Sequence, residues 1–256
     1  QMDNTMVKKF YFIFLIIFTV SCSKQEGVYI DPKMNYYFYN TESHVFLFNI
    51  NKELIVKFIP EKLKLNEQKT VKGMLRVKRY KKIYLPGGRP YFEAAIFIKV
   101  KHKETKGWFL LKSFVSIPPL NIIPMTKFGY KSQYSQFNYN PVGSNLRATI
   151  KRKFKLLLEV EFSFLPVESV KHYLLKKRAI SIPIFIKKNN EIVKIIKATE
   201  KHSNIRISLK EGIGTFLFHK TKSLNLEFFN KAKIQHVFYV ETSGKFYNKA
   251  FRYFQN

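Results

Sequence analysis

Glu93 is a carboxylate in a stretch of sequence where a carboxylate is costly to bury. It stands in the run YFEAAIFIKV (residues 91–100), in which the residues nearest to it are apolar. Such a run is typical of a strand that is buried on both faces, and a carboxylate there requires a partner or a chemical role. Buried carboxylates position substrates and transfer protons, so Glu93 is the first candidate site residue. The alternative is a solvent-exposed glutamate on an alternating strand.

The other residue types that carry out catalysis form no known motif. The chain has one cysteine, Cys22, which excludes an internal disulfide bond and a zinc site with several thiolates. No Gly-x-Ser-x-Gly elbow, P-loop or dinucleotide-binding fingerprint occurs. The six histidines lack the spacing of a metal site: His44, His102, His172, His202, His219 and His236. We therefore expect no cofactor and no bound metal.

The first residues have the pattern of an export signal. Lys8 and Lys9 precede the apolar run at 10–20 (FYFIFLIIFTV), which is shorter than the about 20 residues of a membrane span. The segment 19–22 (TVSC) is similar to the bacterial lipobox, whose cysteine becomes the lipidated first residue of the mature protein. We expect a signal peptide at 1–21, a lipidated tether at 22–34 beginning with Cys22, and one domain at 35–256. The protein is then an exported, membrane-anchored lipoprotein of a bacterial cell envelope; the alternative is an ordinary signal peptide with a cysteine nearby.

The chain is strongly basic. It has 46 Lys and Arg against 17 Asp and Glu, a formal charge of +29, in 256 residues. A hydrophobic content of 46% excludes a disordered chain despite this charge. Basic clusters lie at 78–82, 151–153 and 176–178, flanked by strand-like residues and without a nucleic-acid-binding motif. We therefore expect attraction to anionic lipid headgroups, and nucleic acid is an unlikely partner.

The hydrophobic pattern of most of the chain has a period of two residues, which indicates strands. One short helix is expected at 51–59 (NKELIVKFI), capped by Asn51 and ended by Pro60. A polar hairpin loop is expected at 101–107, and the segment 118–145 has no clear period. The predicted strands are 44–50, 70–77, 91–100, 108–117, two within 147–164, 181–186, 192–196, 205–209, 214–218 and 234–240. Short strands at this spacing predict an antiparallel sheet closed into a barrel or a sandwich.

Three sequence patterns follow one another as they do in a known family. The first is KELIVKFIPEKLKL (52–65), a helix followed by Pro-x-x-Leu. The second is YFEAAIFIKV (91–100) with KGWF (106–109) after a turn, and the third is KFGYKS (127–132). Together they resemble acetoacetate decarboxylase and its relatives. The resemblance implies a mostly β fold, an antiparallel sheet closed into a cone-like barrel with a few short helices, an apolar internal pocket and a tendency to form homo-oligomers.

The resemblance also implies a chemistry. In this family a lysine forms a Schiff base with a β-keto acid, and the iminium accepts electrons as carbon dioxide leaves. The matching lysine is Lys131, after a one-residue gap, and Glu93 matches the family's pocket glutamate. A free lysine amine with a pKa of about 10.4 is protonated at neutral pH, so burial or a neighbouring cation must lower its pKa. Ser132 stands where the family has a second lysine, which leaves burial as the main cause.

Two further family residues are replaced. Thr41 stands where the family has an arginine, and the strand 70–77 contains no acid where the family has one. Arg76 and Arg89 are candidates to supply a cation instead. Three functions remain open: a Schiff-base decarboxylase or lyase acting on a small β-keto acid, a non-catalytic lipoprotein that binds an apolar or anionic small molecule, and a basic surface lipoprotein that binds lipid headgroups or polyanions. Whether the protein is an enzyme is thus undecided by the sequence.

Overall fold

The computed structural model describes ten stretches of the chain. They are residues 37–84, 90–118, 132–142, 145–165, 171–175, 182–188, 191–199, 205–221, 225–243 and 246–253. The predicted signal peptide, the tether with Cys22, and the two boundaries drawn at residues 21 and 34 lie outside them, and so do Lys131 and Arg89. Among the described residues, none of the helices has both the length and the apolar character needed to cross a membrane.

Strands make up most of the described chain. They are β1 (Tyr37–Asn51), β2 (Thr70–Tyr84), β3 (Tyr91–His102), β4 (Thr105–Val115), β5 (Ser132–Tyr134), β6 (Gln136–Val142), β7 (Asn145–Arg152), β8 (Lys155–Phe164), β9 (Lys171–Leu175), β10 (Ile182–Lys188), β11 (Glu191–Thr199), β12 (Ile205–Phe218), β13 (Lys233–Ser243) and β14 (Phe246–Tyr253). The helical elements are the one-turn α2 (Lys52–Ile55) and two 3₁₀ turns, η1 (Val56–Phe58) and η3 (Glu227–Lys231).

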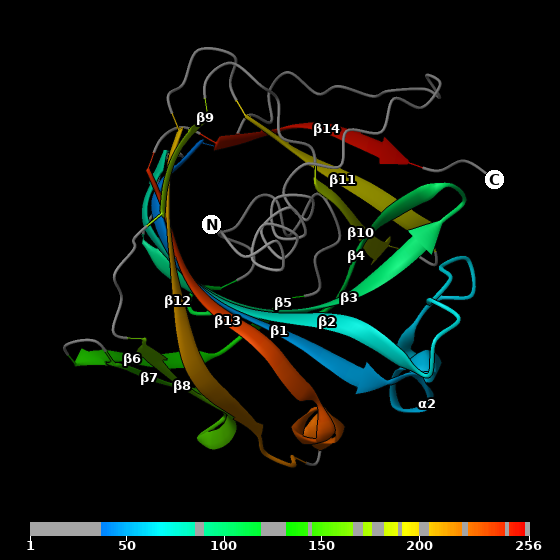
Figure 1. Cartoon of the computed structure of the whole chain (residues 1–256), viewed down its shortest axis with the longest axis horizontal. Helices are drawn as coiled ribbons and strands as arrows, with labels where there is room; N and C mark the ends of the chain where they lie inside the picture. Colours follow the sequence, from blue (N-terminus) through cyan, green and yellow to red (C-terminus); the bar gives the residue numbers. More distant parts are fainter. Residues whose placement is uncertain are drawn as a thin grey trace, which may run out of the picture.

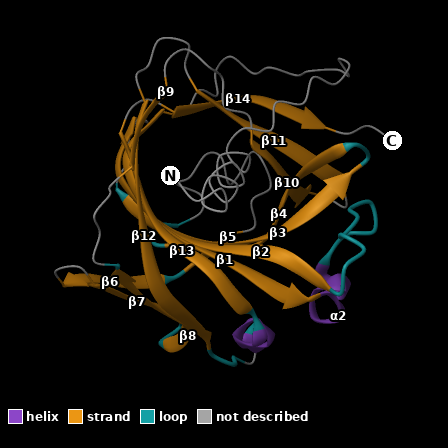
Figure 2. Ribbon diagram, viewed as in Figure 1, coloured by secondary structure: helices purple, strands orange, loops and turns teal. Residues whose placement is uncertain are grey.

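These strands form one sheet that curls into a ring (Figures 1 and 2). The path runs β14-β11-β10-β4-β3-β2-β1-β13-β12-β8-β7-β6. The ring closes because β14 pairs with β11 and also meets β1, where Phe38 pairs with Phe246. The paired strands are antiparallel except β4 with β10 and β4 with β5. The predicted mostly antiparallel β-barrel with few short helices is therefore confirmed.

The sheet has two different faces, because side chains alternate along each strand. On β1 the His44 ring lies 4.8 Å from the Phe162 ring of β8, measured between centroids. Since β6, β7 and β8 lie outside the ring (Figure 1), His44, Phe46 and Phe48 point outward. Their neighbours at odd positions of β1 point towards the centre of the ring. We call these two surfaces the outer face and the inner face.

The main hydrophobic core lies on the outer face. Phe46 and Phe48 of β1 pack edge-on against Phe216 of β12, and Phe48 also packs against Phe229 of η3. Gly73 of β2 is required there, since an added Cβ would lie 2.1 Å from the Phe48 ring. The buried cluster also draws residues from α2, β3, β4, β7 and β8. The core thus joins the ring to the three strands outside it.

Two predicted local structures are confirmed in part. The helix begins as expected, with the Asn51 side chain accepting a hydrogen bond of 3.0 Å from the Glu53 backbone N–H. It ends at Ile55 and continues as the 3₁₀ turn η1 before Pro60. The hairpin is present, but its loop is shorter than the predicted 101–107, since β3 and β4 pair as far as His102 and Thr105. The polar side chains continue the strands here, and Lys103 turns the chain with φ of 49°.

The prediction of an irregular segment at 118–145 is wrong for its described part. Residues 132–134 form β5 and residues 136–142 form β6, which pairs with β7. Proline and asparagine obscured β6 in the sequence. Pro141 is tolerated because β6 is the last strand of the sheet, where a missing N–H costs no sheet hydrogen bond. The strands predicted at 205–209 and 214–218 are one strand, β12, and β9 and β14 were not predicted.

We expect the outer-face core to dominate stability. Phe46→Ala removes a ring that is fully buried and is expected to lower the free energy of unfolding by about 3–5 kcal/mol. Phe154→Ala is the matched control, because that ring is 88% exposed, and its effect should stay within about 0.5 kcal/mol. Urea unfolding measures both. Equal losses for the two variants would contradict this assignment of the core.

His44 should make stability depend on pH. Burial lowers its pKa from 6.5 to about 4. The folded protein therefore keeps the ring neutral, whereas the unfolded chain takes up a proton below pH ~6.5. The stabilisation is complete above pH ~6.5 and is lost as the pH falls towards 4, by up to about 3 kcal/mol. In urea unfolding, the native chain should lose unfolding free energy relative to His44→Phe as the pH falls from about 6.5 to 4. Parallel pH profiles of the two proteins would contradict this prediction.

Candidate functional site

The register of β1 to β5 arranges the inner-face residues in rows that cross the sheet. From one end of the ring to the other the rows are Thr41–Tyr80–Tyr91; Ser43–Lys78–Glu93–Val115; Val45–Arg76–Ala95–Ser113–Ser132; Leu47–Met74–Phe97–Leu110; and Asn49–Lys72 with Lys99–Trp108. Directly paired residues point to the same face. Polar and charged residues therefore meet on the inner face in the second and third rows, and again in the fifth.

Glu93 is the centre of the first polar group. Its side chain is buried, and the residue is 4% exposed. The Tyr80 hydroxyl donates a hydrogen bond of 2.7 Å to Oε2, and the Arg76 guanidinium lies 3.5 Å from Oε1. The alternative of a solvent-exposed glutamate is therefore wrong. With one oxygen engaged by each partner, the carboxylate is held in a fixed orientation.

Tyr80 remains a hydrogen-bond donor over a wide pH range. Burial raises its pKa well above the usual value of 10, and the charge of Glu93 raises it further. The Tyr80 ring stacks on Tyr91 at 4.3 Å between centroids, and the Lys78 amine lies 4.6 Å from the ring centre. The ring is thus held by one contact from β3 and one from its own strand. The sequence analysis missed Tyr80 because the predicted strand ended at residue 77; a strand continued to 84 would have paired it with the start of β3.

Arg76 places a cation beside the carboxylate. Its side chain is 15% exposed, and the guanidinium carbon lies 5.0 Å from the centre of the Phe97 ring. The sequence analysis named Arg76 and Arg89 as substitute cations, and the structure brings Arg76 to Glu93. Arg89 lies outside the described residues. Burying a carboxylate beside an arginine at this distance costs far less free energy than burying an isolated carboxylate.

The row that contains Arg76 ends at Ser132, the residue that follows Lys131 in the sequence. Ser113 of β4 is 1% exposed, and its hydroxyl has no hydrogen-bond partner in the part of the chain that the structure describes. The same is true of the Ser132 hydroxyl, whose residue pairs with Ser113. Buried hydroxyls without a partner are uncommon and indicate a place for water or a ligand. Lys131 itself is not among the described residues.

Thr41 occupies a closed position on the inner face. It is 1% exposed, and its hydroxyl lies 2.6 Å from that of Thr242 on β13. The neighbouring Glu42 points to the outer face, where it forms ion pairs with Arg79 and Lys81. A neutral hydroxyl pair thus stands where the resemblance would place an arginine. Within the described stretches, no group of three or more metal-binding side chains comes together.

Comparison with known proteins identifies the fold. No protein-family model matches the chain, and neither does any curated protein. Several solved structures do. Acetoacetate decarboxylase from Legionella pneumophila matches over 95% of both chains, with 14% identity and a TM-score of 0.63. A second acetoacetate decarboxylase has 13% identity and a TM-score of 0.65, over 87% of this chain and 90% of its own. The enduracididine biosynthesis enzyme MppR, solved with pyruvate, has 12% identity and a TM-score of 0.57, over 86% and 90%.

These matches show that the chain has the fold of acetoacetate decarboxylase. They extend over nearly the whole of each chain, so the likeness is not confined to one hairpin or sheet. The low identities mean that the fold is shared while most side chains differ. The activity of this chain must therefore be argued from its own residues.

We expect Tyr80 to support the buried carboxylate. Tyr80→Phe keeps the stacked ring but removes the donor to Glu93, so the variant should lose about 1–3 kcal/mol of unfolding free energy. Tyr134→Phe is the control, because Tyr134 is 52% exposed and the change should be near zero. Denaturant unfolding measures both losses. If Tyr80→Phe proves as stable as the control, the hydrogen bond to Glu93 does not contribute to the free energy of unfolding.

Proposed function

We propose that the chain is a divergent relative of acetoacetate decarboxylase that acts on a small β-keto acid through a Schiff base at Lys131. The observation that carries the proposal is Glu93, buried on the inner face of this fold and fixed by Tyr80 and Arg76. A buried acid with an oriented hydrogen-bond donor and a cation beside it is typical of a site that binds an anionic substrate and transfers a proton. Pyruvate, a small keto acid, is bound in the structure of the similar enzyme MppR.

The position of Ser132 supports Lys131 as the nucleophile. Ser132 pairs with Ser113, and Ser113 pairs with Ala95 on the strand of Glu93. Two strand spacings, about 10 Å, thus separate the backbone next to Lys131 from the strand that carries the carboxylate. The proposed chemistry requires a neutral amine, and therefore burial of Lys131 or a neighbouring cation that lowers its pKa.

The proposed reaction follows from these roles. The neutral amine of Lys131 attacks the ketone carbon, and loss of water gives an iminium ion. The bond to the carboxylate carbon breaks, its electron pair passes to the iminium nitrogen, and carbon dioxide leaves. The resulting enamine takes a proton on carbon and is hydrolysed, which returns the amine. Arg76 attracts the substrate carboxylate, and Glu93 with Tyr80 positions the substrate and handles the proton.

A non-catalytic binding protein is the second candidate function. The observation in its favour is the buried Thr41–Thr242 pair, which is neutral at the place of the family arginine. The pairing of Lys78 with Glu93 adds a basic residue to the row that contains the carboxylate. Such a pocket is suited to hold a small anion without breaking a bond in it. We further propose that the protein is exported and lipidated at Cys22, which palmitate labelling of the native chain and of Cys22→Ser tests.

Borohydride trapping separates these two functions. The full chain is incubated with acetoacetate or pyruvate, reduced with borohydride, digested and mapped by mass spectrometry. Reduction converts the iminium ion into a stable secondary amine, so the expected adduct is on Lys131 and is lost in Lys131→Arg. Lys127→Arg, four residues earlier, is the matched control and should keep the adduct. Glu93→Gln should keep the adduct while slowing release of carbon dioxide by about 10²-fold or more.

The result that overturns the decarboxylase is a native chain that binds the keto acid, measured by calorimetry, but yields no adduct with any of them. This result would support the binding protein. An adduct on another lysine that persists in Lys131→Arg would overturn the assignment of the nucleophile. Absence of both binding and adduct would overturn both functions.

A further inference from the structure

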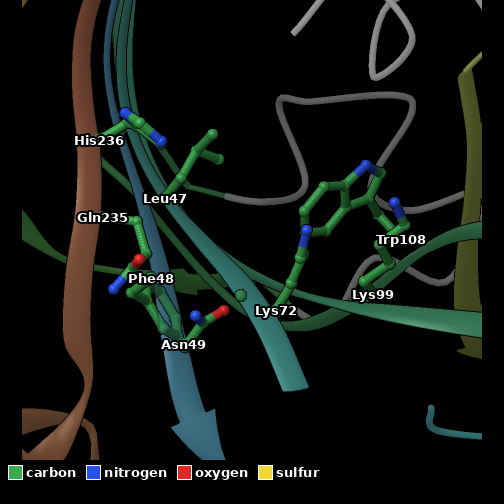
Figure 3. A pocket seen from close by; sticks show the side chains of 9 residues that line it. Leu47, Phe48, Asn49, Lys72, Lys99, Trp108, Gln235 and His236 are labelled. Carbon is green, nitrogen blue, oxygen red and sulfur yellow. The ribbon is translucent and has the colours of Figure 1, made fainter. Parts of the chain in front are cut away.

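A second polar group lies at the other end of the inner face, in a partly open pocket of about 120 Å³ (Figure 3). Lys72 of β2 and Lys99 of β3 rise from neighbouring strands beside the indole of Trp108. Asn49, Gln235 and His236 complete the polar lining. Two amines, two amides and an imidazole therefore converge on one small volume.

The backbone is adapted to this convergence. β1 and β13 pair regularly until Leu47 meets His236, and the next pair is Phe48 with Ile234. Gln235 is the extra residue of this β-bulge, so that Gln235 and His236 both line the pocket. Gly73 also lines the pocket, through its backbone. Bulges often re-aim side chains beside functional sites.

The lysines concentrate positive charge in this pocket. Burial lowers the pKa of Lys99, and the charges of Lys72 and Lys106 lower it further. The pKa of Lys72 is also lowered by burial. The direction of these effects means that both amines are costly to keep protonated, Lys99 partly because of the charge of Lys72. A bound anion removes that cost, because it offsets both charges at once.

This pocket is separate from the group around Glu93. Lys99 follows Glu93 by six positions on β3, or about 20 Å of extended chain. The row of Leu47, Met74, Phe97 and Leu110 divides the two groups, and Phe97 is 1% exposed. One small keto acid cannot span this distance. The two polar groups therefore need separate ligands.

We propose that the pocket of Lys72, Lys99 and Trp108 binds a small oxyanion with two negative charges, such as a phosphate group. Two lysines supply two positive charges, and lysine binds phosphate well as a compact point charge. The side-chain amide of Asn49 and the ring of His236 supply further hydrogen-bonding groups on the opposite side of the pocket. The volume suits an ion or a terminal group of this size. This proposal does not depend on the Schiff-base chemistry.

Trp108 makes the test direct, because it is the only tryptophan of the chain. The full chain is titrated with inorganic phosphate at constant ionic strength, and the tryptophan fluorescence is recorded. We expect a saturable change, with a dissociation constant confirmed by calorimetry. Lys72→Gln and Lys99→Gln should each weaken binding about tenfold, the effect of losing one charged hydrogen bond.

Lys153→Gln is the matched control, because it removes one positive charge from an exposed turn between β7 and β8 and should leave binding unchanged. Lys72→Arg keeps the charge and should retain most of the affinity. Malonate, a dicarboxylate, distinguishes between two kinds of doubly charged oxyanion. If malonate binds and phosphate does not, the ligand is a dicarboxylate, and the proposal of a doubly charged oxyanion is still supported. A fluorescence change that chloride reproduces, or the absence of both heat and fluorescence change, would overturn the site.

Discussion

The constraint on which the rest of the structure depends is that β3, at the centre of the site, is buried on both of its faces along most of its length. On the outer face, β6 to β8 and η3 pack against rings such as Phe46 and Phe48. On the inner face, Phe97 and Ala95 are also almost fully buried. A polar side chain on either face must then bring its partner with it, since an unpaired buried charge costs several kcal/mol or more. This condition accounts for the close grouping of Tyr80, Arg76 and Glu93.

The same constraint explains which features the sequence predicts. Apolar periodicity determines which residues are buried, so the strands, the short capped helix and the burial of Glu93 follow from local patterns. Strand register determines which residue lies beside a buried polar group, and register depends on how two distant segments align. Tyr80 and Thr242 were missed for this reason, although each is a direct contact of a residue that was singled out. β6 was missed because Pro141 and its polar neighbours suit an edge strand, which lacks the usual apolar pattern.

The candidate site shows how the resemblance carries over to this chain. The fold needs only alternation, volume and turns, and it persists at 14% identity and below. Catalysis requires particular side chains at particular positions, and several of these side chains differ in this chain. The place of an arginine on β1 holds Thr41, bonded to Thr242, and the cation near the carboxylate is on β2 instead. Glu93 thus keeps a positive neighbour from a different strand.

This shift alters the charge of the inner face. Around Glu93 the structure places Arg76 and Lys78, so one carboxylate is accompanied by two cations and the local charge is positive. At the other end, Lys72 and Lys99 share a pocket, and none of the described residues that line it is an acid. Positive potential in a partly enclosed space raises the local concentration of anions. The high net charge of the chain is therefore more than a property of its outer surface, because part of it is directed inward, towards the two places for which we propose anionic ligands.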